Sequence, residues 1–131
     1  MQFLEQRRDQ ALALFRIVIG LFFLIHGVQK LLKGTSLLSW PAGPASLIEL
    51  IGGALVLIGL WTRWAALISS GAMAYAYFVV HQPRGLLPIQ NGGELAAVYC
   101  WAFLLLVFTG AGAWSIDQLR TASKKRSLTN A

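Results

Sequence analysis

Five ionisable side chains lie within or at the ends of long apolar runs in this chain: His26, Lys30, Glu49, His81 and Glu94. An ionised side chain in hydrocarbon costs several kcal/mol unless it has a partner or lines a wet cavity. Histidine and carboxylate side chains can take up and release protons, and lysine can donate hydrogen bonds to a ligand. These residues therefore indicate where proton transfer or ligand binding would take place.

Three further polar residues extend this set. Gln29 directly precedes Lys30, Tyr77 lies four residues before His81, and Asn91 lies three residues before Glu94. Their amide and phenol groups add hydrogen-bond donors for a polar ligand. We assign no catalytic residue. The expected ligand-binding residues are His26, Gln29, Lys30, Glu49, Tyr77, His81, Asn91 and Glu94.

The spacing of these side chains does not favour a metal or haem site. No two of the histidines and glutamates are three or four residues apart, the helical spacing of di-metal bundle sites. His26 and His81 differ by about 12 Å in expected depth, whereas two axial haem ligands need nearly equal heights. The only cysteine is Cys100, and no nucleophile–base pair, phosphate loop or dinucleotide motif is present. We therefore expect no metal site.

Each of the five side chains also has a purely structural explanation. The segments 46–49 (SLIE) and 91–94 (NGGE) both match the capping-box pattern, in which a glutamate reaches back to the start of its helix. Lys30 could extend to the lipid head groups, and His81 could be an ordinary residue at a helix end. His26 could be a neutral buried histidine that is bonded to Tyr75, Tyr77 or Tyr99. These alternatives remain open from the sequence alone.

Four apolar runs must position these residues: 11–32, 46–61, 63–81 and 93–112. A helix needs about 20 mostly apolar residues to cross a bilayer. Of the residues in this chain, 56% are hydrophobic and only 12% are charged, whereas soluble domains carry about a quarter charged residues. The sequence therefore predicts an all-α membrane protein with a four-transmembrane-helix bundle. The second run is short, and we expect the apolar loop 36–45 before it to dip into the outer half of the protein.

The distribution of lysine and arginine predicts the orientation. The side that would carry both termini holds eight of the 11 basic residues, and the opposite side holds three. By the positive-inside rule, both termini are cytoplasmic. The net charge of +6 then matches lipid head groups, and we expect no nucleic-acid partner. We divide the chain into a transmembrane domain, residues 1–118, and a basic cytoplasmic tail, residues 119–131.

Two helical hairpins echo each other in a weak parallel repeat. FFLIH at 22–26 resembles YFVVH at 77–81, and GLWT at 59–62 resembles GAWS at 112–115. If the repeat holds, it brings both sets of histidine and glutamate to the outer side of one bundle.

Helical phase predicts how the first two helices pack. One stripe of the first helix contains Arg16, Gly20, Phe23, Gly27 and Lys30. A similar stripe of the second helix contains Glu49, Gly52, Val56, Gly59 and Arg63. Glycines along such stripes permit close contact between helices in lipid. Counting about 1.5 Å per residue puts Lys30 level with Glu49, and His81 level with Glu94. We expect Lys30 to face Glu49 in a polar pocket that opens outward.

Four segments together resemble the DoxX family of small bacterial membrane proteins. They are FLIHGVQK at 23–30, ELIGG at 49–53 with GLWTR at 59–63, LPIQNGGE at 87–94, and GAGAWSID at 110–117. The resemblance runs from about residue 11 to 118, and Ala111 stands where the family usually has proline. It implies a multi-pass protein of the bacterial inner membrane. It also implies a link to redox chemistry, because relatives are named as subunits of quinol- or thiosulfate-linked oxidoreductases.

The leading functional hypothesis is a subunit or accessory protein of a membrane oxidoreductase that interacts with quinone. The chain shows no site for flavin, haem or an iron–sulfur cluster, so a redox-protein partner would be needed. One alternative is a small-solute transporter that acts as a homo-oligomer, because four short helices leave little room for a path in a monomer. The other is a scaffold without activity that docks partner proteins through its basic tail. The sequence does not decide whether the chain is an enzyme.

Overall fold

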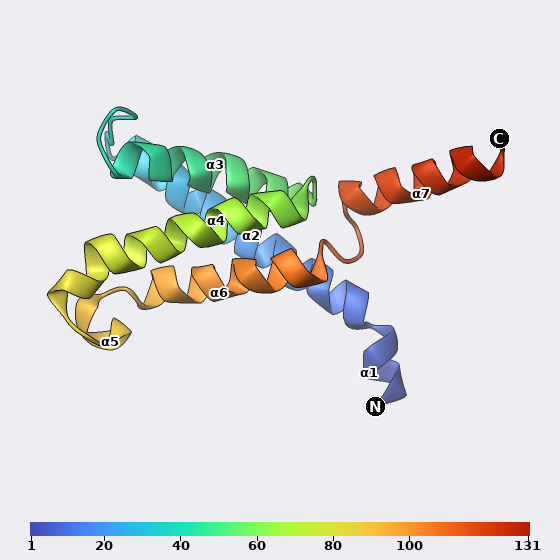
Figure 1. Cartoon of the computed structure of the whole chain (residues 1–131), viewed down its shortest axis with the longest axis horizontal. Coiled ribbons are helices and arrows are strands. Elements are labelled where there is room, and N and C mark those ends of the chain that lie inside the picture. Colours follow the sequence, from blue (N-terminus) through green and yellow to red (C-terminus); the bar gives the residue numbers. More distant parts are fainter.

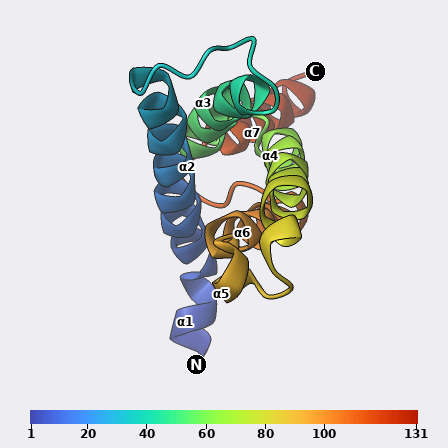
Figure 2. The same ribbon diagram turned by 90° about the vertical axis from the view of Figure 1, so that its left-hand side faces the viewer.

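The structure, a computed structural model of residues 1–131, contains helices and no strands (Figure 1). Its long helices are α2 (Arg8–Leu32), α3 (Ala42–Ile58), α4 (Thr62–Ala76) and α6 (Glu94–Thr109). Viewed end-on, these helices form a ring in the order α2, α3, α4, α6 (Figure 2). The expected all-α bundle of four long helices is confirmed.

Shorter elements lie at the two ends of the bundle. A π-helical turn (η1, Tyr77–His81) and a 3-10 turn (η2, Gln82–Arg84) continue α4, and α5 (Pro88–Asn91) precedes α6. At the opposite end, α1 (Gln2–Gln6) and α7 (Ile116–Thr129) extend away from the bundle. Both termini lie at this second end (Figure 1). We call it the tail end, and we call the end with η2 and α5 the loop end.

Two of the four helical stretches have the length and composition of membrane helices. Residues Arg8–Leu32 and the continuous stretch Thr62–Arg84 are long and apolar enough to cross a bilayer, whereas α3 and α6 are shorter apolar helices of 17 and 16 residues. Large apolar side chains, among them Ile51, Phe108 and Trp101, are exposed on their outer surfaces. Apolar side chains on the outside of a bundle are what a lipid environment requires.

The second helix begins four residues earlier than the sequence predicts. α3 starts at Ala42 rather than Ser46, so the second half of loop 36–45 is helical. Pro44 lies in the first turn of this helix, where its missing amide hydrogen is tolerated. Gly43 allows the start of the helix to rest on the loop, because a Cβ at this residue would collide with the carbonyl of Leu37.

Glycines join α2 and α3 at very short range. An added Cβ at Gly20 would lie 2.6 Å from the backbone nitrogen of Leu57, and one at Gly53 would lie 2.6 Å from that of Leu24. Four residues of the predicted stripe of α2, Arg16, Gly20, Phe23 and Gly27, are buried, whereas Lys30 is partly exposed. The predicted stripe of α3 is wrong at Gly52, which faces Ser69 of α4, because the α3 residues that meet α2 are Leu50, Gly53 and Leu57. Small residues let two backbones pack closely in lipid. The contact leaves no room for a groove between α2 and α3.

An aromatic cluster fills the centre of the ring of helices. The rings of Phe23 and Phe103 pack edge to face with centroids 4.6 Å apart, and Tyr99 lies 5.3 Å from Phe23. Phe103 and Leu106 are fully buried, as is Ala66 of α4. The core therefore joins α2 to α6, which closes the ring of helices, and fixes which face of α6 points inward.

The two hairpins, α2–α3 and α4–α6, share one feature at the tail end. Arg16 of α2 donates to the carbonyls of Val56 and Leu57 at 3.0 and 2.8 Å, near the end of α3. Arg63 of α4 donates to the carbonyls of Val107 and Phe108 at 2.7 and 2.9 Å, near the end of α6. Each hairpin therefore closes with an arginine from its first helix that caps its second helix.

The repeat does not extend to the histidines and glutamates. His26 follows Arg16 by 10 residues, whereas His81 follows Arg63 by 18. Because a helix rises about 1.5 Å per residue, the two histidines lie at different heights above the equivalent arginines. The equivalence of the two arginines therefore does not extend to the two histidines.

Candidate functional site

A single ion pair lies between α2 and α3. The Nζ atom of Lys30 is 2.6 Å from Oε1 of Glu49, and this is the only ion pair in the structure. The Lys30 side chain is 39% exposed and the Glu49 side chain is 5% exposed. The expectation that these two residues face each other is confirmed. The capping-box explanation of Glu49 is wrong, because α3 has already begun at Ala42 and Ser46 donates to the Ala42 carbonyl at 2.8 Å.

Glu49 has one carboxylate oxygen that nothing in the protein satisfies. Oε2 is buried and has no hydrogen-bond partner, while Oε1 binds Lys30. A buried polar atom without a partner costs about 1–3 kcal/mol, and a charged one costs more. The carboxylate therefore has an unused acceptor position, which a proton or a donor group from a ligand would satisfy.

His26 and Tyr99 lie beside this pair. The ring of His26 meets that of Tyr99 edge to face, with centroids 5.9 Å apart. Tyr99 comes from α6 and is buried. We call His26, Lys30, Glu49 and Tyr99 the central polar cluster. Tyr99 was expected only as one of three tyrosines that could contact His26, and the packing of α6 against α2 selects it.

Tyr77, His81 and Asn91 form a second group, the loop-end cluster. Asn91 is buried, and its amide nitrogen donates to the Gly85 carbonyl at 3.1 Å and to the Tyr77 hydroxyl at 3.4 Å. Its amide oxygen accepts from the backbone nitrogen of Gly93 at 2.8 Å. The Nδ1 atom of His81 lies 3.3 Å from the Asn91 carbonyl oxygen. These contacts hold the connection between η2 and α6 in place.

The capping-box explanation of Glu94 is also wrong. The residue at the N-cap of α6 is Gly93, and no side chain caps this helix. Asn91 instead closes a local turn onto the Gly93 amide. Glu94 is exposed and makes no ion pair with His81, although we expect the two at one level.

The eight predicted ligand-binding residues therefore fall into separate groups. His26, Lys30 and Glu49 belong to the central polar cluster. Tyr77, His81 and Asn91 form the loop-end cluster. Gln29 and Glu94 are exposed. No three histidine, cysteine, aspartate or glutamate side chains lie together in an arrangement that could hold a metal ion.

Arg16 is a residue whose environment the sequence does not predict. It belongs to the predicted contact stripe of α2, and its side chain is fully buried. Besides the two carbonyls of α3, it donates to those of Ala111, Ala113 and Trp114 at 2.9, 3.3 and 2.9 Å. The guanidinium group thus joins the end of α3 to the connection between α6 and α7. No local pattern signals this, because the acceptors are 40 to 98 residues away in the chain.

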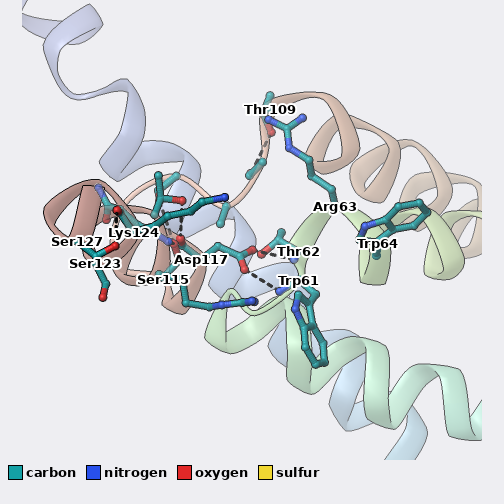
Figure 3. Close-up of a pocket in the computed structure, with 16 residues that line it drawn as sticks. Trp61, Thr62, Arg63, Trp64, Thr109, Ser115, Asp117, Ser123, Lys124 and Ser127 are labelled. Atoms are coloured by element: carbon teal, nitrogen blue, oxygen red, sulfur yellow. Dashed lines mark hydrogen bonds between the residues drawn. The ribbon is translucent and has the colours of Figure 1, made fainter. Parts of the chain in front are cut away.

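The tail end also contains a wide-mouthed cavity of about 900 Å³ (Figure 3). It lies between the start of α4, the connection from α6 and the helix α7, at the opposite end of the bundle from the predicted outer pocket. Its charged lining residues are Arg63, Asp117, Arg120 and Lys124. Asp117 is engaged with the protein, since its two oxygens accept from the backbone nitrogens of Trp61 and Thr62, both at 2.8 Å.

Known proteins resemble this chain along most of its length. A protein of Haemophilus influenzae is 43% identical over 125 residues, which cover 87% of this chain and 93% of that protein. A membrane protein of Mycobacterium tuberculosis is 32% identical and matches 88% of this chain and 83% of its own length. CatD of Bacillus subtilis, which is provisionally named an oxidoreductase, is 28% identical across 90% of this chain. No solved structure matches the chain.

The DoxX family model matches residues 11–82. This region runs from α2 to η2, so it contains the hairpin of α2 and α3 with the Lys30–Glu49 pair. The similarity to the Haemophilus protein continues through most of the remaining chain. The chain therefore belongs to the DoxX family of membrane proteins.

Proposed function

We propose that this protein is a membrane subunit or accessory protein of an oxidoreductase system and that it binds quinone or quinol at the central polar cluster. The observation that carries the proposal is the state of Glu49. One oxygen of this buried carboxylate is paired with Lys30, and the other has no partner. A quinol hydroxyl is a donor of the kind that this oxygen lacks.

The residues of the cluster fit the polar head of a quinone. Lys30 and His26 can each donate a hydrogen bond to a carbonyl oxygen, and Oε2 of Glu49 can accept one from a hydroxyl. The Tyr99 hydroxyl offers a further donor or acceptor. A quinone, when bound, supplies two-electron redox chemistry that is coupled to protons. Because α2 and α3 are in close contact, its apolar tail would lie along the lipid-facing surface of the bundle rather than between them.

The side chains of the cluster can hold and move protons. Glu49 and His26 can each change protonation state, and Lys30 holds the Glu49 carboxylate in position at 2.6 Å. The Lys30 side chain is 39% exposed, so protons could reach the buried Glu49 carboxylate from outside the bundle through Lys30. We propose that protons pass between Glu49 and the loop end, where His81 and Glu94 could relay them.

The family supports a redox role, and a partner follows from the chemistry. CatD of Bacillus subtilis is provisionally named an oxidoreductase. This chain has one cysteine and no motif for flavin, haem or an iron–sulfur cluster. A redox-protein partner would therefore deliver or remove the electrons. We further propose that the protein lies in the bacterial inner membrane, crosses it four times and has both termini in the cytoplasm.

Quinone extraction from the purified full-length protein tests the proposal. We expect quinone to co-purify, and we expect Glu49→Gln to lower its amount about tenfold, since a neutral amide at this position removes the carboxylate acceptor. His26→Ala should lower it as well. Glu5→Gln, which makes the same chemical change at an exposed residue of α1, should retain it. Absence of quinone from the wild-type protein, or equal binding by all variants, would contradict the proposal.

A further inference from the structure

The two equivalent arginines at the tail end differ in what surrounds them. Arg16 donates from Nε, Nη1 and Nη2 to five backbone carbonyls. Arg63 donates only from Nη1, to the end of α6. Its Nε and Nη2 atoms have no hydrogen-bond partner. They lie next to Gly110, where an added Cβ would be 3.4 Å from Nε and 3.2 Å from Nη2. In the first hairpin, backbone carbonyls accept from all three guanidinium nitrogens of the arginine. In the second hairpin, two of these nitrogens have no acceptor in the chain.

The free side of Arg63 borders the 900 Å³ cavity described above. In the first hairpin, the connection between α6 and α7 occupies the corresponding place and supplies the carbonyl acceptors of Arg16. In the second hairpin no segment of the chain does so. An occupant that satisfies Arg63 must therefore bring its own oxygen acceptors.

The charges around the cavity define that occupant more closely. Arg63 and Lys124 reach toward the space from α4 and α7 (Figure 3), and Arg120 lines it as well. The guanidinium of Arg120 also lies 5.7 Å from the centre of the Trp61 ring. The single carboxylate in the lining, Asp117, is already bound to two backbone amides. Three cations against one engaged carboxylate favour an anion with several oxygen atoms.

The position of the cavity points to the level of the lipid head groups. Trp61 and Trp64 line it and are 55% and 70% exposed. Exposed tryptophans at the ends of membrane helices lie at the interface between lipid and water. We infer that this cavity binds a phosphate group, either in the head group of an anionic lipid or as free phosphate. Arg63, Arg120 and Lys124 bind its oxygens, and α7 forms one wall of the site.

Two double variants on α7 test the inference in the full-length protein. Arg120→Gln/Lys124→Gln removes two cations that line the cavity, and Lys125→Gln/Arg126→Gln removes two that do not. Both lose the same charge from the same helix, and both leave the cap that Arg63 provides intact. Native mass spectrometry measures how much phosphatidylglycerol or phosphatidylcholine each protein retains. We expect the first variant to retain about tenfold less phosphatidylglycerol than the second, which should resemble the wild-type protein.

A second arm distinguishes lipid from free phosphate. Equilibrium dialysis with labelled inorganic phosphate uses the same proteins in phosphatidylcholine nanodiscs. Phosphate binding that only the first variant loses would assign the site to free phosphate, and selective retention of phosphatidylglycerol would assign it to lipid. The inference is overturned if both variants lose binding equally, which would reflect diffuse attraction to the helix, or if the wild-type protein binds neither phosphatidylglycerol nor phosphate. Neither arm depends on quinone binding at Glu49.

Discussion

Arg16 shows how a charged residue can be buried in a lipid-facing bundle without forming an ion pair. Its five acceptors are backbone carbonyls, and two of them belong to the end of α3. The C-terminal end of a helix carries a partial negative charge and carbonyls that have no partner within the helix. The arginine and the helix end therefore satisfy each other, and the connection from α6 completes the set.

Replacing Arg16 should destabilise the whole bundle. In Arg16→Gln the shorter amide cannot reach all five carbonyls, so several buried acceptors lose their donor. We expect the free energy of unfolding to fall by about 3 kcal/mol or more. Denaturant titration of the protein in a mild detergent measures this. Arg8→Gln, at an exposed position of the same helix, is the control and should change stability little. Equal effects of the two changes would show that the Arg16 contacts do not stabilise the fold.

The Lys30–Glu49 pair can be separated from its surroundings by a double-mutant cycle. Lys30→Met leaves a buried carboxylate without a counter-charge, and we expect it to lower the free energy of unfolding by about 2 kcal/mol. The double variant Lys30→Met/Glu49→Leu removes both charges and should recover more than half of that loss. Thermal and denaturant unfolding of the wild-type protein, Lys30→Met, Glu49→Leu and the double variant give the coupling energy of the pair. Additive effects of the two changes would mean that the contact contributes no stability.

At the scale of the elements, the two hairpins are held in different ways. Glycines bring α2 and α3 together at backbone distance, as Gly20 and Gly53 show. In the other hairpin, the small residues Ala66 and Ser70 of α4 face α6, and the hydroxyl of Ser70 donates to the Cys100 carbonyl at 2.8 Å. The α2–α3 contact holds Lys30 next to Glu49, so the geometry of the central polar cluster depends on these glycines.

Alanine substitutions can test this dependence. Gly53→Ala places a methyl group 2.6 Å from the backbone of Leu24, so the helices must separate, and we expect a loss of about 1–3 kcal/mol in stability. Gly71→Ala adds the same methyl group to α4 in open space, and higher helix propensity should stabilise it by up to about 1 kcal/mol. Unfolding of the two variants provides the comparison. If Gly53→Ala were as stable as Gly71→Ala, the close contact of α2 and α3 would be unsupported.

The basic tail is itself a helix, and its start is fixed to the bundle. Ser115 caps α7 by accepting from the Gln118 amide at 3.1 Å, and Asp117 donates its backbone amide to the Gly59 carbonyl at 2.8 Å. The boundary that we expect after residue 118 falls inside this helix. Because α7 forms one wall of the tail-end cavity, its fixed start sets where Arg120 and Lys124 lie.

At the scale of the whole molecule, both termini lie at one end of the bundle (Figure 1). An even number of long helices requires this, and the basic residues of α7 add to the positive charge at the same end. With a bilayer across the four helices, the positive-inside rule predicts a cytoplasmic tail end, which is the orientation that we propose. The loop-end cluster would then face the periplasm.

Cysteine labelling tests this orientation. In a Cys100→Ala background, Leu38→Cys at the loop end and Ala122→Cys in α7 each provide one exposed thiol. A maleimide that cannot cross membranes should label Leu38→Cys in intact spheroplasts. It should label Ala122→Cys only after the membrane is permeabilised. The reverse pattern would place the termini outside.

The sequence alone determined the elements and the pairing of the first two helices. The apolar runs predict four long helices because crossing lipid requires continuous apolar length. The glycine stripe of α2 and the match in level of Lys30 and Glu49 follow from helical periodicity, which is a local property. This is why the contact between Lys30 and Glu49 could be predicted before the fold was known.

Only the tertiary structure decided the rest. It selected Tyr99 as the neighbour of His26, separated His81 and Asn91 from the central polar cluster, started α3 at Ala42 and buried Arg16. Each of these outcomes depends on which backbone carbonyls and ring faces come together from segments far apart in the chain. Helical periodicity fixes the direction of a side chain on its own helix, but it does not specify what the neighbouring helix presents to it.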